Sequence, residues 1–252
     1  MRQREAHARI REGSRLAEKD PAGYERWETP RGSYWIPAGN GKVLLLLLAQ
    51  QESGVYRSRD RGVQAGDVVI DCGAHVGLYT LEALQAGASQ VVAVEPAPAN
   101  LECLRRNLSS QIADGRVLVV PQGVWDKQDL LPLYEDPTNS AADGFVVPMV
   151  NRRVTHQIPL TTIDLLVHEM GLSRVDLIKM DIKGATERAL RGATATIARH
   201  RPQVILATEE YADEPKALFE LVQNLNSGYQ VECGSCSLMP GMTVATDVLL
   251  FR

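Results

Sequence analysis

Four short polar or glycine-containing stretches each follow a run of apolar residues. They are Asp71–Gly77, Glu95, Gln122–Trp125 and Asp181. Short apolar runs of this kind are typical of buried strands, and in an open α/β sheet ligands bind beyond the carboxyl ends of the strands, where the strand order reverses. We therefore expect these stretches to converge on one edge of a sheet and to form a ligand site there.

The first two stretches together suit a nucleoside. Gly73 and Gly77 allow a tight turn and the close approach of a ligand, and amides at the start of the next helix would point at that ligand. Glu95 lies 22 positions after Gly73, close to the spacing at which an acid accepts hydrogen bonds from ribose hydroxyls. A carboxylate at Asp71 disfavours a diphosphate. An adenosine joined to a zwitterionic amino acid therefore fits better than NAD.

The elements that must position these residues follow from the hydrophobic pattern. Strands are expected at 68–70, 91–94, 117–120, 175–180, 204–207, 229–232 and 247–251, and helices between them, including one continuous helix at about 184–198. This alternation predicts an α/β fold with a doubly wound, mostly parallel, seven-stranded Rossmann-like sheet, an antiparallel C-terminal strand and an N-terminal helical extension.

The regions outside this alternation are interpreted as additions to one domain at 51–252. Residues 1–50 form a cap or an oligomer contact, with a helix up to about residue 20, stopped by Pro21, and short strands at 34–36 and 43–48. An insertion at about 126–170 holds strand-like pieces at 131–134, 145–150 and 156–160, then a helix capped by Thr161 or Thr162. A subunit contact through the first helix would make a homodimer.

Charge and composition limit the kinds of partner and the cellular location that we expect for this chain. The formal net charge of -4 gives no attraction to phosphate backbones, so nucleic acid is not expected and a small molecule is. The apolar run Val43–Ala49 is far shorter than the roughly 20 residues that span a bilayer. With no secretory signal recognised, a soluble cytoplasmic protein is expected. Cys233 and Cys236 have the spacing of half a zinc site, but a hairpin turn between the last two strands is the preferred interpretation.

Four motifs resemble those of the FkbM-type methyltransferases. They are Asp71–Gly77, then Val94-Glu95-Pro96 with Asn100, then 158–164, and Ile178-Lys179-Met180-Asp181-Ile182-Lys183-Gly184-Ala185. The resemblance implies a class I enzyme that uses S-adenosyl-L-methionine, with O-methylation of hydroxyls on sugars or natural products. It also implies that Asp71, Gly73 and Gly77 line the methionine part of the cofactor, that Glu95 holds the ribose and that Val124 lies by adenine. Neighbouring Ala74, His75, Pro96, Gly123 and Trp125 complete the expected cofactor-binding set.

The acceptor side departs from the family pattern. Lys179, Asp181 and Gly184 match it, but Lys183 and Thr186 stand where acids are expected. Asp181 is the first candidate for a catalytic base or an acceptor orienter, with a structural helix cap as the alternative. His75 is a second catalytic candidate, or a packing residue of the loop. Acceptor contacts are expected from Lys183, His156 and Glu210. The aromatic residues Trp125, Tyr134 and Phe145 form either part of the acceptor pocket or a small core of the insertion.

Three hypotheses for the function remain open. The first is the O-methyltransferase, in which Mg²⁺ on Asp181 is possible but not favoured, because Lys183 replaces an acid. The second is a relative that binds the cofactor but is catalytically silent and serves as a partner subunit. The third is an NAD-dependent oxidoreductase, which the loop at Asp71 disfavours.

Overall fold

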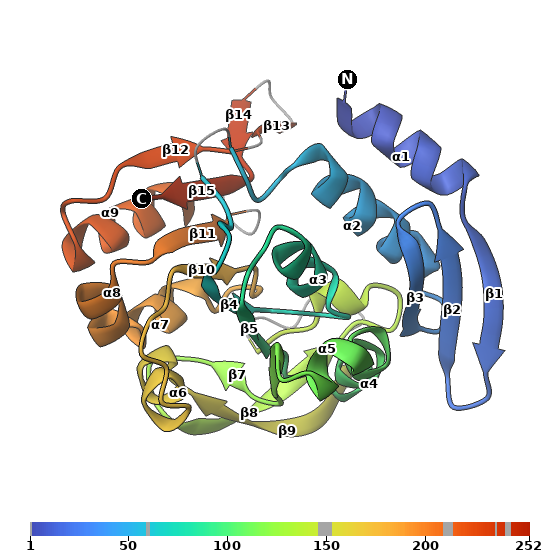
Figure 1. The fold of residues 1–252 in the computed structure, drawn as a ribbon, viewed down its shortest axis with the longest axis horizontal. Coiled ribbons are helices and arrows are strands. Elements are labelled where there is room, and N and C mark those ends of the chain that lie inside the picture. Colours follow the sequence, from blue (N-terminus) through green and yellow to red (C-terminus); the bar gives the residue numbers. More distant parts are fainter. Residues whose placement is uncertain (1, 59–60, 146–152, 209–213, 235, 240–242) are drawn as a thin grey trace.

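The centre of the molecule is a mostly parallel sheet (Figure 1). The computed structural model describes residues 2–58, 61–145, 153–208, 214–234, 236–239 and 243–252. Seven strands of this described part form the sheet, in the spatial order β12 (Val231–Cys233), β15 (Val248–Phe251), β11 (Gln203–Ala207), β10 (Leu177–Met180), β4 (Val68–Cys72), β5 (Gln90–Val94) and β6 (Val117–Val120). Strand β15 is antiparallel to both of its neighbours, and the other neighbouring pairs are parallel. The predicted mostly parallel sheet with an antiparallel C-terminal strand is confirmed.

Helices cover both faces of this sheet, so alternate residues of one strand join different cores. Ile70 and Ile178 belong to a core with α6 (Ile163–Glu169), α7 (Thr186–Arg191), α8 (Thr194–His200) and α9 (Glu214–Leu225). Val69 and Leu177 belong to a core with α3 (Leu78–Gln85), α4 (Pro98–Asn107) and the partly buried Ile112 of α5 (Ser109–Ala113). Burial on both faces explains why these strands are apolar throughout. Each fully buried aliphatic side chain contributes roughly 1.5–3 kcal/mol.

The strand order reverses between β4 and β10. The chain moves outward from β4 to β5 and β6, and then returns to place β10 and β11 on the other side of β4. Such a reversal opens a crevice beyond the carboxyl ends of the strands. The loops after β4, β5 and β10, which carry the candidate site residues, therefore meet at that crevice.

The N-terminal part differs from its prediction in two places. Helix α1 (Arg2–Glu12) is followed by the antiparallel strands β1 (Arg15–Asp20), β2 (Tyr24–Thr29) and β3 (Gly32–Pro37). The single helix predicted up to residue 20 is therefore wrong beyond Glu12, because pairing of β1 with β2 outweighs the helical spacing of the charges.

The leucine run forms a helix, not the predicted strand. Helix α2 (Gly41–Ser53) contains the whole run and ends at Gly54, which has a φ of 79°. Leu44, Leu45, Leu48 and Ala49 are buried on one side of it. Leucine and the glutamines that follow are good helix formers, and a short apolar run does not by itself separate a strand from a helix.

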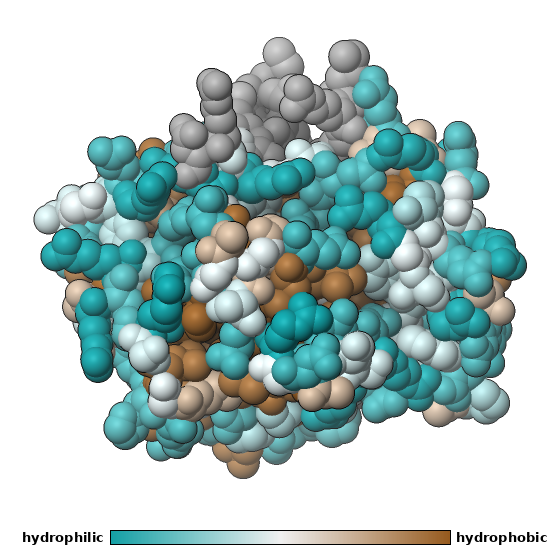
Figure 2. All heavy atoms as spheres, in the orientation of Figure 1, coloured by the Kyte–Doolittle hydropathy of each residue, from teal (hydrophilic) through white to brown (hydrophobic). Residues whose placement is uncertain are grey.

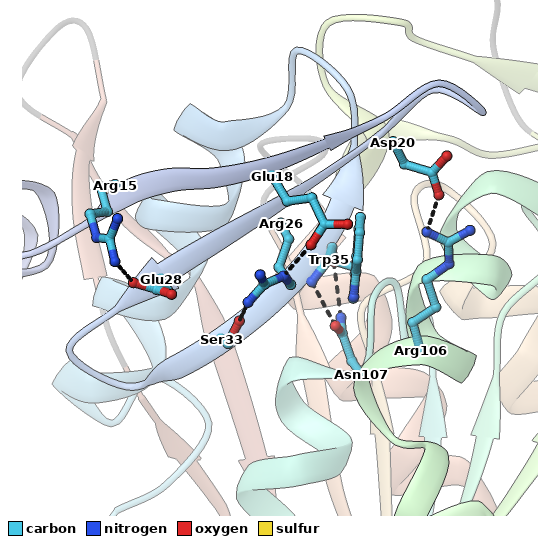
Figure 3. A network of polar contacts seen from close by, with 9 residues as sticks. All are labelled: Arg15, Glu18, Asp20, Arg26, Glu28, Ser33, Trp35, Arg106 and Asn107. Atoms are coloured by element: carbon cyan, nitrogen blue, oxygen red, sulfur yellow. Dashed lines mark hydrogen bonds and ion pairs between the residues drawn. The ribbon is translucent and has the colours of Figure 1, made fainter.

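Polar contacts fix the N-terminal strands to α4 (Figure 3). Asn107 accepts the backbone N–H of Trp35 at 2.6 Å and donates to its carbonyl at 2.9 Å. The guanidinium of Arg106 pairs with Asp20 at 2.6 Å and lies 4.6 and 4.7 Å from the ring centroids of Tyr24 and Trp35. The strands therefore pack on the sheet's helical layer at the right of Figure 1.

The insertion forms a small sheet together with β7 (Gly123–Val124), the short strand that precedes it. Strand β9 (Arg153–Thr161) lies between β7 and β8 (Asp129–Glu135). The expected strands at 131–134 and 156–160 are confirmed as parts of β8 and β9, while most of the one expected at 145–150 lies outside the described residues. Thr162 caps α6 as predicted, accepting the N–H of Leu165 at 3.0 Å.

Two further predictions near the C-terminus are wrong. The helix expected at 184–198 is divided into α7 and α8 near Gly192, where a Cβ would lie 2.1 Å from the carbonyl oxygen of Trp125. The turn expected at Cys233–Cys236 does not join the last two strands of the sheet, because a second hairpin, β13 (Cys236–Met239) with β14 (Thr243–Thr246), lies between β12 and β15.

The surface seen in Figure 2 is largely hydrophilic, with hydrophobic residues gathered near its middle. Among the described residues, no helix has both the length and the apolar character that a bilayer crossing requires.

Candidate functional site

A cavity of about 890 Å³, including its opening to solvent, lies at the crevice where the strand order reverses. Its wall takes Gly73, Ala74 and His75 from the loop after β4, and Glu95 and Pro96 from the loop after β5. Asp181, Ile182 and Lys183 come from the loop after β10, and Gln122, Gly123 and Val124 follow β6. Helices α2, α3 and α4, the short helix η1 (Ser140–Ala142) and residues 143–145 also contribute to the wall.

The glycine-rich loop lies tightly against its neighbours. The N–H groups of Gly73 and Ala74 donate to the carbonyl of Val94 at 2.9 and 3.0 Å. Gly73 has a φ of 77°, and a Cβ there would lie 2.1 Å from the carbonyl oxygen of Asp181. Only glycine therefore allows the loops after β4 and β10 to approach this closely.

Glu95 is a buried acid on the wall of the cavity, with 4% of its surface exposed. Its Oε2 accepts the N–H of His75 at 2.8 Å, and its Oε1 accepts from Ala97 at 2.9 Å and from Asn100 at 3.3 Å. Burial raises the pKa of Glu95, and these hydrogen bonds act against that rise. The carboxylate is thus held in one orientation.

Asp71 does not line the cavity. It is completely buried and forms an ion pair with Lys179 at 3.1 Å, and it accepts the hydroxyl of Thr80 at 2.7 Å. Lys179 does line the cavity, and its ammonium also donates to the carbonyl of Gly73 at 3.0 Å. Burial alone would lower the pKa of Lys179, but the charges of Asp71 and Asp181 raise it overall. Lys179, fixed by its ion pair with Asp71, therefore holds the glycine-rich loop through the carbonyl of Gly73.

Asp181 lies between a phenol and an ammonium group. Its Oδ2 accepts the hydroxyl of Tyr56 at 2.7 Å and its Oδ1 is 3.5 Å from Nζ of Lys183. Burial alone would raise the pKa of Asp181, but the charges of Lys183 and Lys179 and the Tyr56 hydroxyl lower it to about 2. Asp181 is therefore a carboxylate at neutral pH and a weak base.

His75 is a neutral imidazole on the same wall. Its Nε2 shares a hydrogen bond of 2.8 Å with Oγ of Ser140. Its backbone has a φ of 51°, in the left-handed region. Burial lowers the pKa of His75 to about 4, and the charge of Lys179 acts in the same direction.

One known protein family matches the part of the chain that contains most of the residues of this site. A family model described as the methyltransferase FkbM domain matches residues 71–231. The chain belongs to the FkbM methyltransferase family. The match begins at Asp71, so it includes the loops after β4, β5 and β10 but not α2 or Tyr56.

Two relatives of this FkbM domain illustrate the range of similarity. The methyltransferase sdnD of Sordaria araneosa is 25% identical over 154 residues, which cover 49% of this chain and 59% of the relative. The crystal structure of a methyltransferase FkbM from Methylobacillus flagellatus KT superposes with a TM-score of 0.54 at 18% identity, covering 99% of this chain and 57% of that one. The chain therefore corresponds to less than two thirds of either relative's length, and the structural likeness concerns the fold.

The structure brings together most of the site residues expected from the sequence. Those that line the cavity of the FkbM domain are Gly73, Ala74, His75, Glu95, Pro96, Gly123, Val124, Asp181 and Lys183, with Phe145 from the insertion.

Other expected residues are placed elsewhere. Trp125 lies beside Arg188, whose guanidinium is 5.6 Å from the ring centroid. Gly77 begins α3 and packs near Leu108. His156 lies on β9, with Nδ1 3.9 Å from Glu135. Tyr134 and Asp71 are also absent from the cavity wall as described, and Glu210 lies outside the described residues.

Several wall residues were not expected. Leu47, Gln50 and Gln51 come from α2, and Tyr56 follows that helix. The hydrophobic pattern predicts a strand for the leucine run, and that prediction does not bring residues 47–56 to the site. Lys179 belongs to the quoted fourth motif, and its pairing with Asp71 follows from their adjacent positions in β10 and β4.

The described residues contain no group of three or more His, Cys, Asp or Glu side chains that could hold a metal ion. Asp181, which the sequence indicates as the one possible oxygen ligand, is paired with Lys183.

Proposed function

We propose that this chain is an S-adenosylmethionine-dependent O-methyltransferase that acts on a hydroxyl group of a small molecule, a sugar or a natural product. The observation that carries the proposal is the fixed Glu95 carboxylate on the cavity wall, next to the glycine-rich loop. An acid at the end of the second strand of such a sheet is suited to the hydroxyls of a ribose.

The residues of the wall fit a nucleoside. A carboxylate has roughly four lone-pair sites, and the hydrogen bonds from His75, Ala97 and Asn100 occupy three of them, which leaves capacity for a ribose hydroxyl. Oδ1 of Asn100 and Nδ1 of His75 are buried and have no hydrogen-bond partner within the described part of the chain. Buried polar atoms are usually paired, so these two atoms favour a polar ligand at this wall.

Other wall residues suit the two ends of the cofactor. Val124, Pro96 and Phe145 offer apolar contacts for an adenine, while Gly73 and Ala74 line the wall where the amino-acid part would lie. Asp71 supports this binding indirectly, because its pair with Lys179 fixes the carbonyl of Gly73. This assigns Asp71 a positioning role instead of the direct contact expected from the sequence.

S-adenosylmethionine supplies a methyl group that is already activated for transfer. The remaining task of the chain is to hold an acceptor hydroxyl in line with that group, and good alignment alone supplies about 7–11 kcal/mol of a reaction barrier. A general base works best when its pKa is near the working pH. Asp181 at about 2 and His75 at about 4 are both far below neutrality. We therefore assign Asp181 to orienting the hydroxyl by accepting its hydrogen bond. As the O–CH3 bond forms and the S–CH3 bond breaks, the hydroxyl proton is lost to solvent water.

The acceptor is proposed to meet Asp181 and Lys183 on the side of the cavity formed by α2. Gln50 and Gln51 line this side, and we assign their carboxamides to polar groups of an acceptor. The variant Lys183→Glu is expected to change the preference among acceptors while the affinity for S-adenosylhomocysteine stays within about twofold, because in this proposal Glu95 and the glycine-rich loop hold the cofactor and Lys183 faces the acceptor. Equal losses in activity on the acceptor and in affinity for S-adenosylhomocysteine would contradict this assignment.

Calorimetry with S-adenosylhomocysteine tests the cofactor site. The wild-type protein should bind it and should not bind NAD. Glu95→Gln should weaken binding by about tenfold or more, the loss expected for one charge-assisted hydrogen bond. Glu187→Gln is the matched control, since Glu187 is 58% exposed and pairs only with Arg191 among the described residues. Binding of NAD without binding of S-adenosylhomocysteine would favour an oxidoreductase and refute the proposal.

Turnover tests the reaction. Formation of S-adenosylhomocysteine is measured with a panel of hydroxylated acceptors, and a ¹³C-labelled methyl group identifies oxygen as the methylated atom by NMR. Methylation at nitrogen or carbon would refute the O-methyltransferase assignment. Cofactor binding with no turnover on the panel would support the catalytically silent relative instead.

A further inference from the structure

Four residues on the cavity wall form a closed ring of hydrogen bonds. Glu95 accepts the backbone N–H of His75 at 2.8 Å, and the imidazole of His75 bonds to Oγ of Ser140 at 2.8 Å. The carbonyl of Ser140 accepts from Nδ2 of Asn100 at 3.0 Å, and the same Nδ2 donates to Glu95 at 3.3 Å, which closes the ring. The four residues come from the loop after β4, the loop after β5, α4 and η1.

A residue of the N-terminal part anchors this ring. The N–H of Ser140 donates to Oδ1 of Asn40 at 2.8 Å, and Nδ2 of Asn40 donates to the carbonyl of Pro137 at 3.3 Å. Asn40 is 2% exposed and Ser140 is 6% exposed. Asn40 directly precedes α2 and lies outside the residues matched by the FkbM family model.

The ring determines which polar atoms remain for a ligand. Both hydrogens of the Asn100 amide are used, by Glu95 and by Ser140, so its Oδ1 is left as an acceptor. Nε2 of His75 is used by Ser140, so its Nδ1 is left. These two atoms have no partner within the described residues. Asn100, His75 and Glu95 all line the cavity, and the arrangement of their polar groups depends on the position of Ser140.

We propose that Ser140 and Asn40 are positioning residues of the cofactor site. They hold Glu95, Asn100 and His75 in the arrangement that binds the ribose of S-adenosylmethionine, and they attach η1 as the wall over that ribose. This inference rests on the proposed function of Glu95. Neither residue touches the transferred methyl group in this scheme, so their loss weakens cofactor binding and leaves the methyl-transfer step little changed.

The decisive variant is Ser140→Ala, which removes the hydroxyl but keeps both backbone hydrogen bonds of the ring. We expect its dissociation constant for S-adenosylhomocysteine to rise about three- to tenfold, the effect of one net hydrogen bond. Asn40→Ala should give a similar rise, and the double variant should show less than the product of the two, because both act on one network. Ser140→Thr retains a hydroxyl and should restore affinity.

Controls separate this role from general destabilisation. Ser110→Ala and Asn224→Ala change the same residue types at exposed helix positions, and both should bind as the wild type does. The melting temperature without ligand should be alike in Ser140→Ala and Ser140→Thr, since a purely structural role would show there. Hydrogen exchange at Ser140–Ala142 should slow when S-adenosylhomocysteine is added to the wild type, and less so in Asn40→Ala.

The outcomes are distinguishable. If the wild type binds S-adenosylhomocysteine and Ser140→Ala binds it equally well, the positioning role is overturned and the proposed function stands. The positioning role is likewise overturned if Ser140→Thr fails to restore affinity and the loss of affinity in the Ser140 variants follows a loss of their melting temperature without ligand. If the wild type does not bind the compound at all, both proposals fail.

Discussion

Replacing Gly73 by alanine tests the contact that joins the loop after β4 to the loop after β10. The new Cβ would lie 2.1 Å from the carbonyl oxygen of Asp181 and 3.1 Å from Cγ2 of Ile182. The backbone oxygen cannot rotate away as a flexible side chain would, so one of the two loops must move. Because both loops form the cavity wall, the movement should reduce cofactor binding as well as stability.

The magnitude has two parts. A non-glycine residue at a φ of 77° costs about 1–2 kcal/mol in the left-handed region. Displacing packed neighbours costs about 1–3 kcal/mol more. We therefore expect Gly73→Ala to lower the free energy of unfolding by about 2–5 kcal/mol, which is a large part of the roughly 5–15 kcal/mol typical of native domains.

Gly115→Ala is the matched control for this variant. Gly115 has a φ of 71°, and nothing lies within 4 Å of an added Cβ. It should therefore show only the conformational cost of about 1–2 kcal/mol. Urea denaturation measures both losses, and calorimetry with S-adenosylhomocysteine measures binding. Equal losses of stability in the two variants, with binding retained by Gly73→Ala, would refute the close approach of these loops.

Three further predictions concern buried charges and the N-terminal strands. Lys179→Met leaves Asp71 as an uncompensated buried carboxylate and should cost about 3–5 kcal/mol in urea denaturation, much of which Asp71→Asn in the same chain should recover. Asn107→Ala removes the two hydrogen bonds to Trp35 and should cost about 1–3 kcal/mol, with a loss of near-UV circular dichroism from the tryptophan. Burial lowers the pKa of His75 to about 4 from its ordinary 6.5, so the unfolded chain binds more protons between these values and stability should fall as the pH is lowered from 6.5 towards 4. His75→Gln should make that decline shallower in urea titrations.

The central sheet and the residues at its strand ends could be predicted from the sequence because their signals are local. Apolar runs such as Val91–Val94 are buried on both faces, so each has the same character in the sequence and in the fold. Once these runs are parallel neighbours, Gly73, Glu95 and Asp181 must meet at one edge. The structure places all three on the cavity wall.

The surroundings of the site depend on contacts between distant parts of the chain. The ion pair of Asp71 with Lys179 joins residues 71 and 179, and the bond of Asn40 to Ser140 joins residues 40 and 140. Neither spacing carries a sequence signal. Val124 is the last residue of β7 and lines the cavity, whereas the next residue, Trp125, has its side chain beside Arg188 of α7. The alternation of side chains along a strand sends these neighbours to opposite sides.

The buried pair of Asp71 and Lys179 also bears on how the central strands find their alignment. The two residues are direct partners in the parallel pairing of β4 with β10. Their strands otherwise offer Val, Ile, Leu, Cys and Met, which are largely interchangeable by size and polarity. A slip of β10 by one residue relative to β4 would place Lys179 and Asp71 on opposite faces of the sheet, where they could not form their ion pair. We therefore expect this single pair to select one alignment among several that apolar packing alone would tolerate.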